Sequence, residues 1–134
     1  MGGLVIVDTS VWVAYFRGTD PLIQSGLDGL IDDDSVAIVP PIRLELILGC
    51  RKAQRKLLIE RINAVHHLGV TEQTWALAEK LSLDMRGTGT TPGVVDVLIA
   101  AAASQHEALL WTLDQDFAPL FRGKHVRAFS PARE

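Results

Sequence analysis

Four carboxylates in this chain occupy positions from which they could act together: Asp8, Glu45, Asp96 and Asp114. Asp8 and Asp114 each follow a short apolar run that is typical of a buried strand, and Glu45 comes a few residues after a third such run. Asp96 falls in the first turn of an apolar helix that has no lysine or arginine to neutralise it. A carboxylate that is buried without a partner costs several kcal/mol or takes up a proton. The pattern therefore indicates an acidic functional site.

Such a site needs a cation. Two carboxylates about 5 Å apart repel each other by about 3 kcal/mol at an effective dielectric constant of about 20. A divalent ion removes that repulsion, and a ligand set of oxygen atoms without histidine or cysteine favours Mg²⁺ or Mn²⁺ over Zn²⁺. Ions of this kind activate water and stabilise the oxygens of an in-line displacement. The acids therefore predict hydrolysis of a phosphodiester.

Asp8 also has other interpretations. The stretch Asp8-Thr9-Ser10 is a good N-terminal cap for the helix expected after it. An aspartate at a strand end can instead be the nucleophile of a phosphohydrolase, although that chemistry usually has a second acid two residues later, where this chain has Ser10. A third possibility is a non-catalytic module that binds RNA or another protein. These alternatives stay open at the level of the sequence.

The elements that must position the acids alternate between strands and helices. Apolar runs predict strands at residues 4–7, 36–39 and 109–112, and a weaker one at 126–129. Caps, prolines and apolar periodicity predict helices at residues 9–17, 21–31, 41–49, 51–68, 71–85 and 93–106. Strands that alternate with helices favour parallel pairing with right-handed crossovers. We therefore expect an α/β fold with three layers, α/β/α, around a central, mainly parallel sheet.

The composition fits one domain. The chain has 134 residues, of which 48% are hydrophobic, so we expect a single domain over residues 1–134 with its core at about residues 4–129. Cys50 is the only cysteine, which excludes an internal disulfide and suits a reducing compartment. No apolar run reaches the roughly 18 residues of a membrane-spanning helix, and no signal peptide is apparent at the start. We therefore expect a cytoplasmic protein that does not contact a membrane.

Other conspicuous patterns favour structural roles. The run Asp32-Asp33-Asp34 predicts a solvated turn. His66 and His67 fall in a predicted helix, where neighbouring side chains point about 100° apart and do not share a metal. Trp75 is expected in the core. Thr91 is expected to cap the helix that carries Asp96, with Pro92 in its first turn.

Four sequence blocks resemble the signature blocks of the PIN-domain nucleases: Asp-Thr-Ser-Val-Trp at 8–12, Glu-Leu-Ile-Leu-Gly at 45–49, Asp-Val-Leu-Ile-Ala-Ala at 96–101 and Thr-Leu-Asp-Gln-Asp-Phe at 112–117. Their order and the chain length are similar to those of the VapC toxins of bacterial toxin–antitoxin pairs, and the resemblance extends from Leu4 to Phe129. It implies a PIN-like α/β/α domain and an endoribonuclease that depends on Mg²⁺ or Mn²⁺ and leaves a 5′-phosphate. It also implies a homodimer and a VapB-like antitoxin whose C-terminal segment blocks the acidic site.

The resemblance assigns roles to individual residues. The residues that match the metal-binding and catalytic acids are Asp8, Glu45, Asp96 and Asp114. Asp116 matches an acid that assists through water in that family. The residues that match supporting hydroxyls are Thr112, Ser10 and Thr9.

An RNA-cleaving enzyme must hold a polyanion beside its acids, and this chain has a net charge of -3. Basic residues are nevertheless concentrated between Arg43 and Arg61, where six lysines and arginines accompany two acids. The candidates for holding RNA are Arg51, Lys52, Arg55, Lys56, Arg122 and Lys124. The alternative for these residues is an ordinary solvated surface. Few aromatic residues are available to stack on bases, so we expect recognition of RNA shape and phosphate position.

Overall fold

A five-stranded parallel sheet forms the centre of the computed structural model, which describes residues 3–89 and 91–131. The strands are β1 (Val5–Val7), β2 (Val36–Ile38), β3 (His66–His67), β4 (Leu109–Trp111) and β5 (Arg127–Ala128). Their order in the sheet is β3-β2-β1-β4-β5, and every neighbouring pair is parallel. The strand order therefore reverses at β1. In open parallel sheets, ligands bind beyond the carboxyl ends of the strands at such a reversal.

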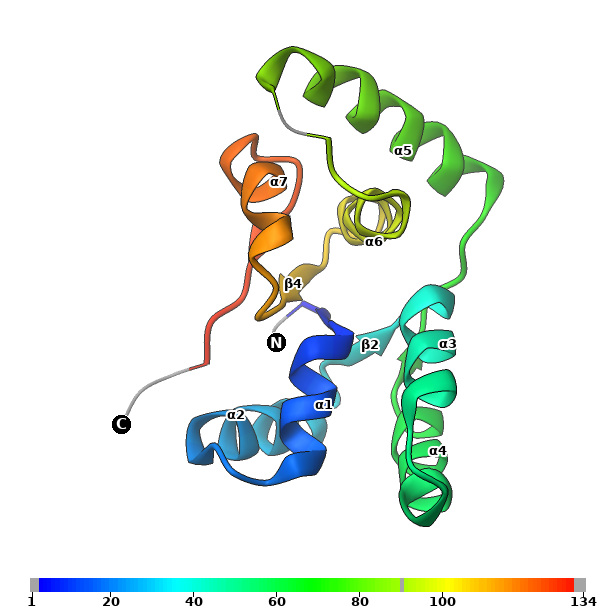
Figure 1. The fold of residues 1–134 in the computed structure, drawn as a ribbon, viewed down its shortest axis with the longest axis vertical. Coiled ribbons are helices and arrows are strands. Elements are labelled where there is room, and N and C mark those ends of the chain that lie inside the picture. The colour runs from blue at the N-terminus through cyan, green and yellow to red at the C-terminus, as the bar shows by residue number, and fades with distance from the viewer. Residues whose placement is uncertain (1–2, 90, 132–134) are drawn as a thin grey trace.

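Helices cover both faces of the sheet. They are α1 (Thr9–Arg17), α2 (Pro21–Asp32), α3 (Pro40–Gly49), α4 (Arg55–Asn63), α5 (Glu72–Met85), α6 (Val94–Gln105) and α7 (Ala118–Arg122), with short 3-10 helices η1 (Lys52–Gln54), η2 (Arg86–Thr88) and η3 (Gln115–Phe117). Figure 1 shows α1 and α2 on one side of the strands and α5 and α6 on the other. The predicted three-layer α/β/α architecture is confirmed. None of the described helices is long and apolar enough to cross a membrane.

The core holds α6 firmly, and α6 carries Asp96. Every residue from Val97 to Ala103 is buried, and four of these are consecutive alanines, whose small side chains allow close packing. At the other end of this helix, the amide of Gln105 accepts a hydrogen bond from the buried hydroxyl of Thr74 on α5. The helix that presents Asp96 is therefore fixed by apolar packing along its length and by a polar contact near its end.

A helix does lie within the predicted range 51–68, but its predicted end is wrong. Helix α4 ends at Asn63, and His66–His67 form β3, which pairs with β2 at the edge of the sheet. Neither histidine belongs to a candidate metal group in the described part of the chain. His67 Nε2 lies 3.0 Å from the carbonyl oxygen of Ile62. The two rings therefore contact backbone at the sheet edge, which is consistent with the expected structural role.

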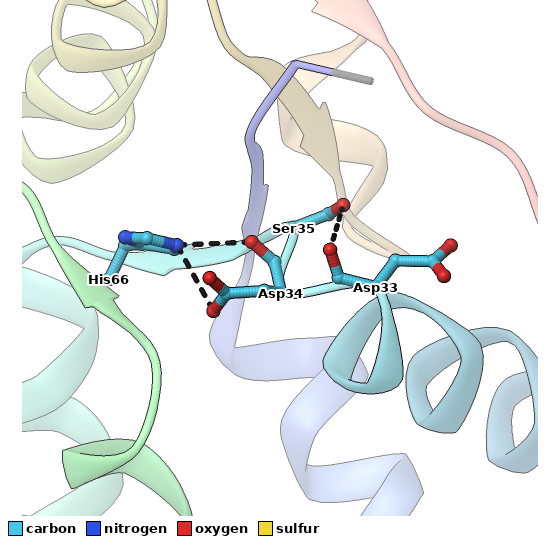
Figure 2. A network of polar contacts seen from close by, with 4 residues as sticks. All are labelled: Asp33, Asp34, Ser35 and His66. Atoms are coloured by element: carbon cyan, nitrogen blue, oxygen red, sulfur yellow. Dashed lines mark hydrogen bonds and ion pairs between the residues drawn. The ribbon is translucent and has the colours of Figure 1, made fainter. Parts of the chain in front are cut away.

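The segment before β2 contains the three consecutive aspartates and contacts β3; Asp32 is the last residue of α2, and Asp33 and Asp34 form the turn. All three are exposed, as predicted, and Asp34 adopts a left-handed backbone conformation with φ 58. Figure 2 shows His66 Nε2 against Asp34, 3.0 Å from its carbonyl oxygen and 3.2 Å from its carboxylate Oδ1. Ser35 Oγ also lies 3.4 Å from the carbonyl oxygen of Asp33. The turn is therefore a solvated link between two strands.

Two further predictions are wrong. Trp75 is 50% exposed, because the core-facing positions of α5 belong to Thr74, Ala78, Leu81 and Met85. Helix α6 begins at Val94 with Gly93 as its N-cap, so neither Thr91 nor Pro92 has the predicted capping role. The structure also adds η3 and α7 between β4 and β5, where no helix was predicted.

Candidate active site at the ends of β1 and β4

Asp8 follows β1 directly and is the one buried carboxylate among the described residues, with 5% of its surface exposed. It occupies the N-cap position of α1, and its carbonyl oxygen accepts hydrogen bonds from the amides of Val11 and Trp12. Its side chain does not cap the helix. Instead, Oδ2 accepts hydrogen bonds from the hydroxyls of Ser10, at 2.9 Å, and Thr112, at 2.8 Å. The carboxylate therefore contacts Thr112, which directly follows β4, instead of capping the helix.

Thr112 and Ser10 connect Asp8 to the loop after β4. The Thr112 hydroxyl accepts a hydrogen bond from the amide of Asp114 at 3.0 Å, and the Ser10 hydroxyl accepts one from the amide of Leu113 at 3.0 Å. Each hydroxyl therefore donates to Asp8 and accepts from the loop. This arrangement fixes the orientation of the Asp8 carboxylate and the path of the backbone that carries Asp114.

Asp96, Asp114 and Asp116 form a compact group, which we call the acidic triad. Each offers one carboxylate oxygen, and these three atoms lie within 4.8 Å of one another. Asp96 comes from the first turn of α6, whereas Asp114 and Asp116 come from the loop and η3 after β4. Asp114 Oδ1 accepts a hydrogen bond from the amide of Asp116 at 2.9 Å, which brings these two side chains together. Sequence reasoning gave Asp116 only a supporting role, but the structure places it within the group.

The electrostatics of the site are concentrated on Asp96, which is half-buried. Burial raises the pKa of this carboxyl from 3.8 to about 6, because water no longer fully solvates the charged form. Nearby negative charges also raise it, in the order Asp114, Asp8, Asp116 and Glu45. All five acids therefore act in one electrostatic field. Without a cation, Asp96 therefore holds its proton to a higher pH than an ordinary aspartate does.

Glu45 lies on α3 at the rim of the site and is exposed. The hydroxyl of Thr9 donates a hydrogen bond to its Oε1 at 2.7 Å, which connects α1 to α3. Neither Glu45 nor Asp8 belongs to the group of oxygens within 4.8 Å, although both raise the pKa of Asp96. The structure therefore gathers the four predicted acids around one site, with the triad at its centre and these two residues beside it.

Two hollows adjoin the acids. One, of about 580 Å³, is lined by Thr9 and Glu45 and also by Arg17 and Arg51. The other, of about 360 Å³, is lined by Asp116 together with residues before α6 and in η3. A single ion pair is found within residues 3–89 and 91–131, and it joins His66 to Asp34. The predicted RNA-holding residues are all exposed and, like the other described lysines and arginines, form no ion pair with a described carboxylate: Arg51, Lys52, Arg55, Lys56, Arg122 and Lys124.

Comparisons with known proteins identify the family. The sequence model of the PIN domain matches residues 5–120. Ribonuclease VapC11 of Mycobacterium tuberculosis is 29% identical over 132 residues, which cover 95% of this chain and 98% of the relative. Ribonuclease VapC32 of that species is 31% identical over 113 residues, which cover 84% and 86%. The structure of VapBC2 from Rickettsia felis is similar with a TM-score of 0.79 at 18% identity, over 94% of this chain and 97% of that one. The chain therefore belongs to the PIN-domain family, in its VapC group.

Proposed function

We propose that this protein is an endoribonuclease that depends on Mg²⁺ or Mn²⁺ and acts as the toxin of a toxin–antitoxin pair. The observation that carries the proposal is the acidic triad, in which three carboxylate oxygens lie within 4.8 Å of one another. Hard divalent cations prefer oxygen ligands of this kind. The names of the VapC relatives, which are ribonucleases, support RNA as the substrate.

The residues present fit such an ion. Asp96, Asp114 and Asp116 would hold it, with Asp8 and Glu45 as the further acids of the site. When bound, the ion would activate water and stabilise the negative charge that develops on the phosphate.

The supporting hydroxyls have a separate task. Thr112 and Ser10 hold one oxygen of Asp8, and Oδ1 accepts no hydrogen bond within the described chain, so it remains available to a ligand. Thr9 restrains Glu45 in the same way from α1. Partners of this kind orient ligating carboxylates, and their loss commonly costs about 10- to 100-fold in metal affinity or activity.

The test is cleavage of RNA by purified protein with Mg²⁺, with Mn²⁺ or with EDTA, together with calorimetric titration of each ion. We expect cleavage only with a divalent ion, and loss of both cleavage and ion binding in Asp96→Asn and Asp116→Asn. Glu79→Gln is the matched control, because it removes one exposed carboxylate from the middle of α5. Cleavage that survives in EDTA, or in Asp96→Asn, would contradict the proposal.

We extend the proposal to protein partners. The similar structure from Rickettsia felis is of VapBC2, and we infer a VapB-like antitoxin for this chain too. Apolar side chains remain exposed on α3, where Leu44 and Leu48 are 58% and 78% exposed, and Val94 on α6 is 75% exposed. Leu44 and Leu48 are four residues apart and so share one face of α3, and a contiguous apolar face on a surface is typical of protein interfaces, which supports both an antitoxin and a homodimer. Light scattering of the purified chain, alone and with the product of the adjacent gene, tests both expectations.

A further inference from the structure

Two surface hollows share Pro119, the second residue of α7. The hollow that contains Asp116 is also lined by Pro119, and Pro119 lines a second hollow of about 420 Å³ as well. This second hollow lies between the end of α5 with η2 and the end of α7, and we call it the α7 hollow. Its residues are Asp84, Met85, Thr88, Pro119, Arg122, Gly123 and His125. The two hollows therefore adjoin at Pro119, with Asp116 lining one and a pair of nitrogen-bearing side chains lining the other.

The side chains of Arg122 and His125 have nitrogen donors that are not used in contacts with other described residues. Neither side chain forms a hydrogen bond or ion pair with another residue in the described ranges 3–89 and 91–131. Asp84 is the carboxylate that lines the same hollow, and it forms no ion pair with either of them. A guanidinium group offers donors in a geometry that matches phosphate oxygens. An imidazole N–H is a further donor.

The backbone around Gly123 makes room for the His125 ring. A Cβ atom at Gly123 would lie 2.7 Å from His125 Cδ2 and 2.8 Å from its Nε2, so the ring occupies space that any other residue would fill. The turn itself is held by hydrogen bonds from the amide of Gly123 to the carbonyl of Pro119 and from the amide of His125 to the carbonyl of Leu120. Gly123 has φ -76, a conformation that alanine also adopts. An alanine there would displace the ring without straining the backbone.

We propose that the α7 hollow binds a backbone phosphate of the RNA next to the cleavage site, through Arg122 and His125, with Gly123 positioning the histidine. The inference rests on the proposed ribonuclease function. RNA that reaches the acids must be held by cations outside them, because five carboxylates repel its phosphates. The α7 hollow supplies donors that have no partner among the described residues, and it shares Pro119 with the hollow that Asp116 lines.

The test compares Arg122→Gln, His125→Gln and Gly123→Ala with wild type. Cleavage kinetics use a fluorescein-labelled single-stranded RNA of mixed sequence with Mn²⁺, and binding is measured by anisotropy on the Asp96→Asn background. We expect KM and Kd to rise about fivefold to twentyfold with kcat unchanged, since one contact to phosphate is lost. In Arg122→Gln the slope of log Kd against log salt should also become shallower by about 0.7.

Two controls isolate the effect. Lys80→Gln removes one exposed charge from α5 outside the hollow, and Gly69→Ala adds a methyl group where nothing lies within 4 Å. Both should match wild type, and all variants should retain its Tm.

The outcomes separate this inference from the proposed function. Wild-type kinetics in all three hollow variants, while wild type cleaves RNA, would overturn the α7 subsite and leave the ribonuclease intact. An equal rise of KM and Kd in Lys80→Gln would also overturn the α7 subsite, because any surface cation would then contribute as much to RNA binding. A wild-type protein that neither binds nor cleaves RNA would overturn both.

Discussion

Replacement of Asp96 by asparagine should stabilise the metal-free protein at neutral pH. The pKa of this carboxyl is raised from 3.8 in the unfolded chain to about 6 in the folded one, chiefly by burial and then by the charge of Asp114. A shift of about two units corresponds to about 3 kcal/mol at 1.36 kcal/mol per unit. Solvent reaches part of this side chain and screens it, so we expect about 1 to 2 kcal/mol. In a domain of this size that is roughly 3 to 10 °C in Tm.

The sign of the pH dependence follows from the two pKa values. Below about pH 4 the carboxyl is protonated in both states, and above about pH 6 it is ionised in both. Between these limits the folded protein retains a proton that the unfolded chain has released, so the free energy of unfolding of the wild type falls as the pH rises. Asp96→Asn has no carboxyl at this position, so its free energy of unfolding lacks this pH dependence. The stability difference between variant and wild type should therefore be small at pH 4 and grow through pH 6.

Urea denaturation at several pH values in EDTA provides the measurement, with Glu79→Gln as the control for loss of one exposed carboxylate. With excess Mn²⁺, the wild type should become more stable than Asp96→Asn. A ligand at about 100 times its Kd stabilises the folded state by about 2.7 kcal/mol, and Asp96→Asn should lose most of that gain. The reasoning is refuted if Asp96→Asn is less stable than wild type at pH 7.5 in EDTA, or if the difference between them does not change with pH.

Four further substitutions test other parts of the structure. Thr112→Val should lower RNA cleavage about 10- to 100-fold, because Asp8 and the amide of Asp114 lose a shared partner, and Thr112→Ser should restore it. Gly26→Ala should lower the free energy of unfolding by about 1 to 3 kcal/mol, since the new Cβ would lie 3.0 Å from the Trp111 ring. Gly29→Ala, in the same helix with nothing within 4 Å, should instead raise it by about 0.4 to 1 kcal/mol. Equal effects of the two alanines in urea denaturation would contradict this account.

The acids at strand ends could be predicted because their signal is local. An apolar run that stops at a carboxylate indicates a buried strand and the position of its last side chain, and this logic located Asp8 and Asp114. Asp96 was predicted for a different reason, namely the lack of a cation on its helix, and its half-buried position agrees. The strand order was not predicted, because it depends on contacts between segments far apart in the chain.

Other features could not be read from local patterns. The strand β3 has two residues, too few for an alternating pattern, and it follows a helix whose apolar periodicity extends past Asn63. Trp75 is large and apolar, which favoured burial, but the face of α5 that packs against α6 is set by its smaller neighbours. The central position of Asp116 depends on its hydrogen bond to Asp114, which only the conformation of η3 reveals.

The edge strands of the sheet are short, and this limits how other proteins can bind. Its outermost strands, β3 and β5, have two residues each, and the side chains there are exposed. A partner that adds a strand to a sheet needs a longer row of free amides and carbonyls than these edge strands offer. A protein partner must therefore bind to the helices through side-chain contacts. The specificity of binding will be determined by residues on the helix surfaces rather than by backbone pairing.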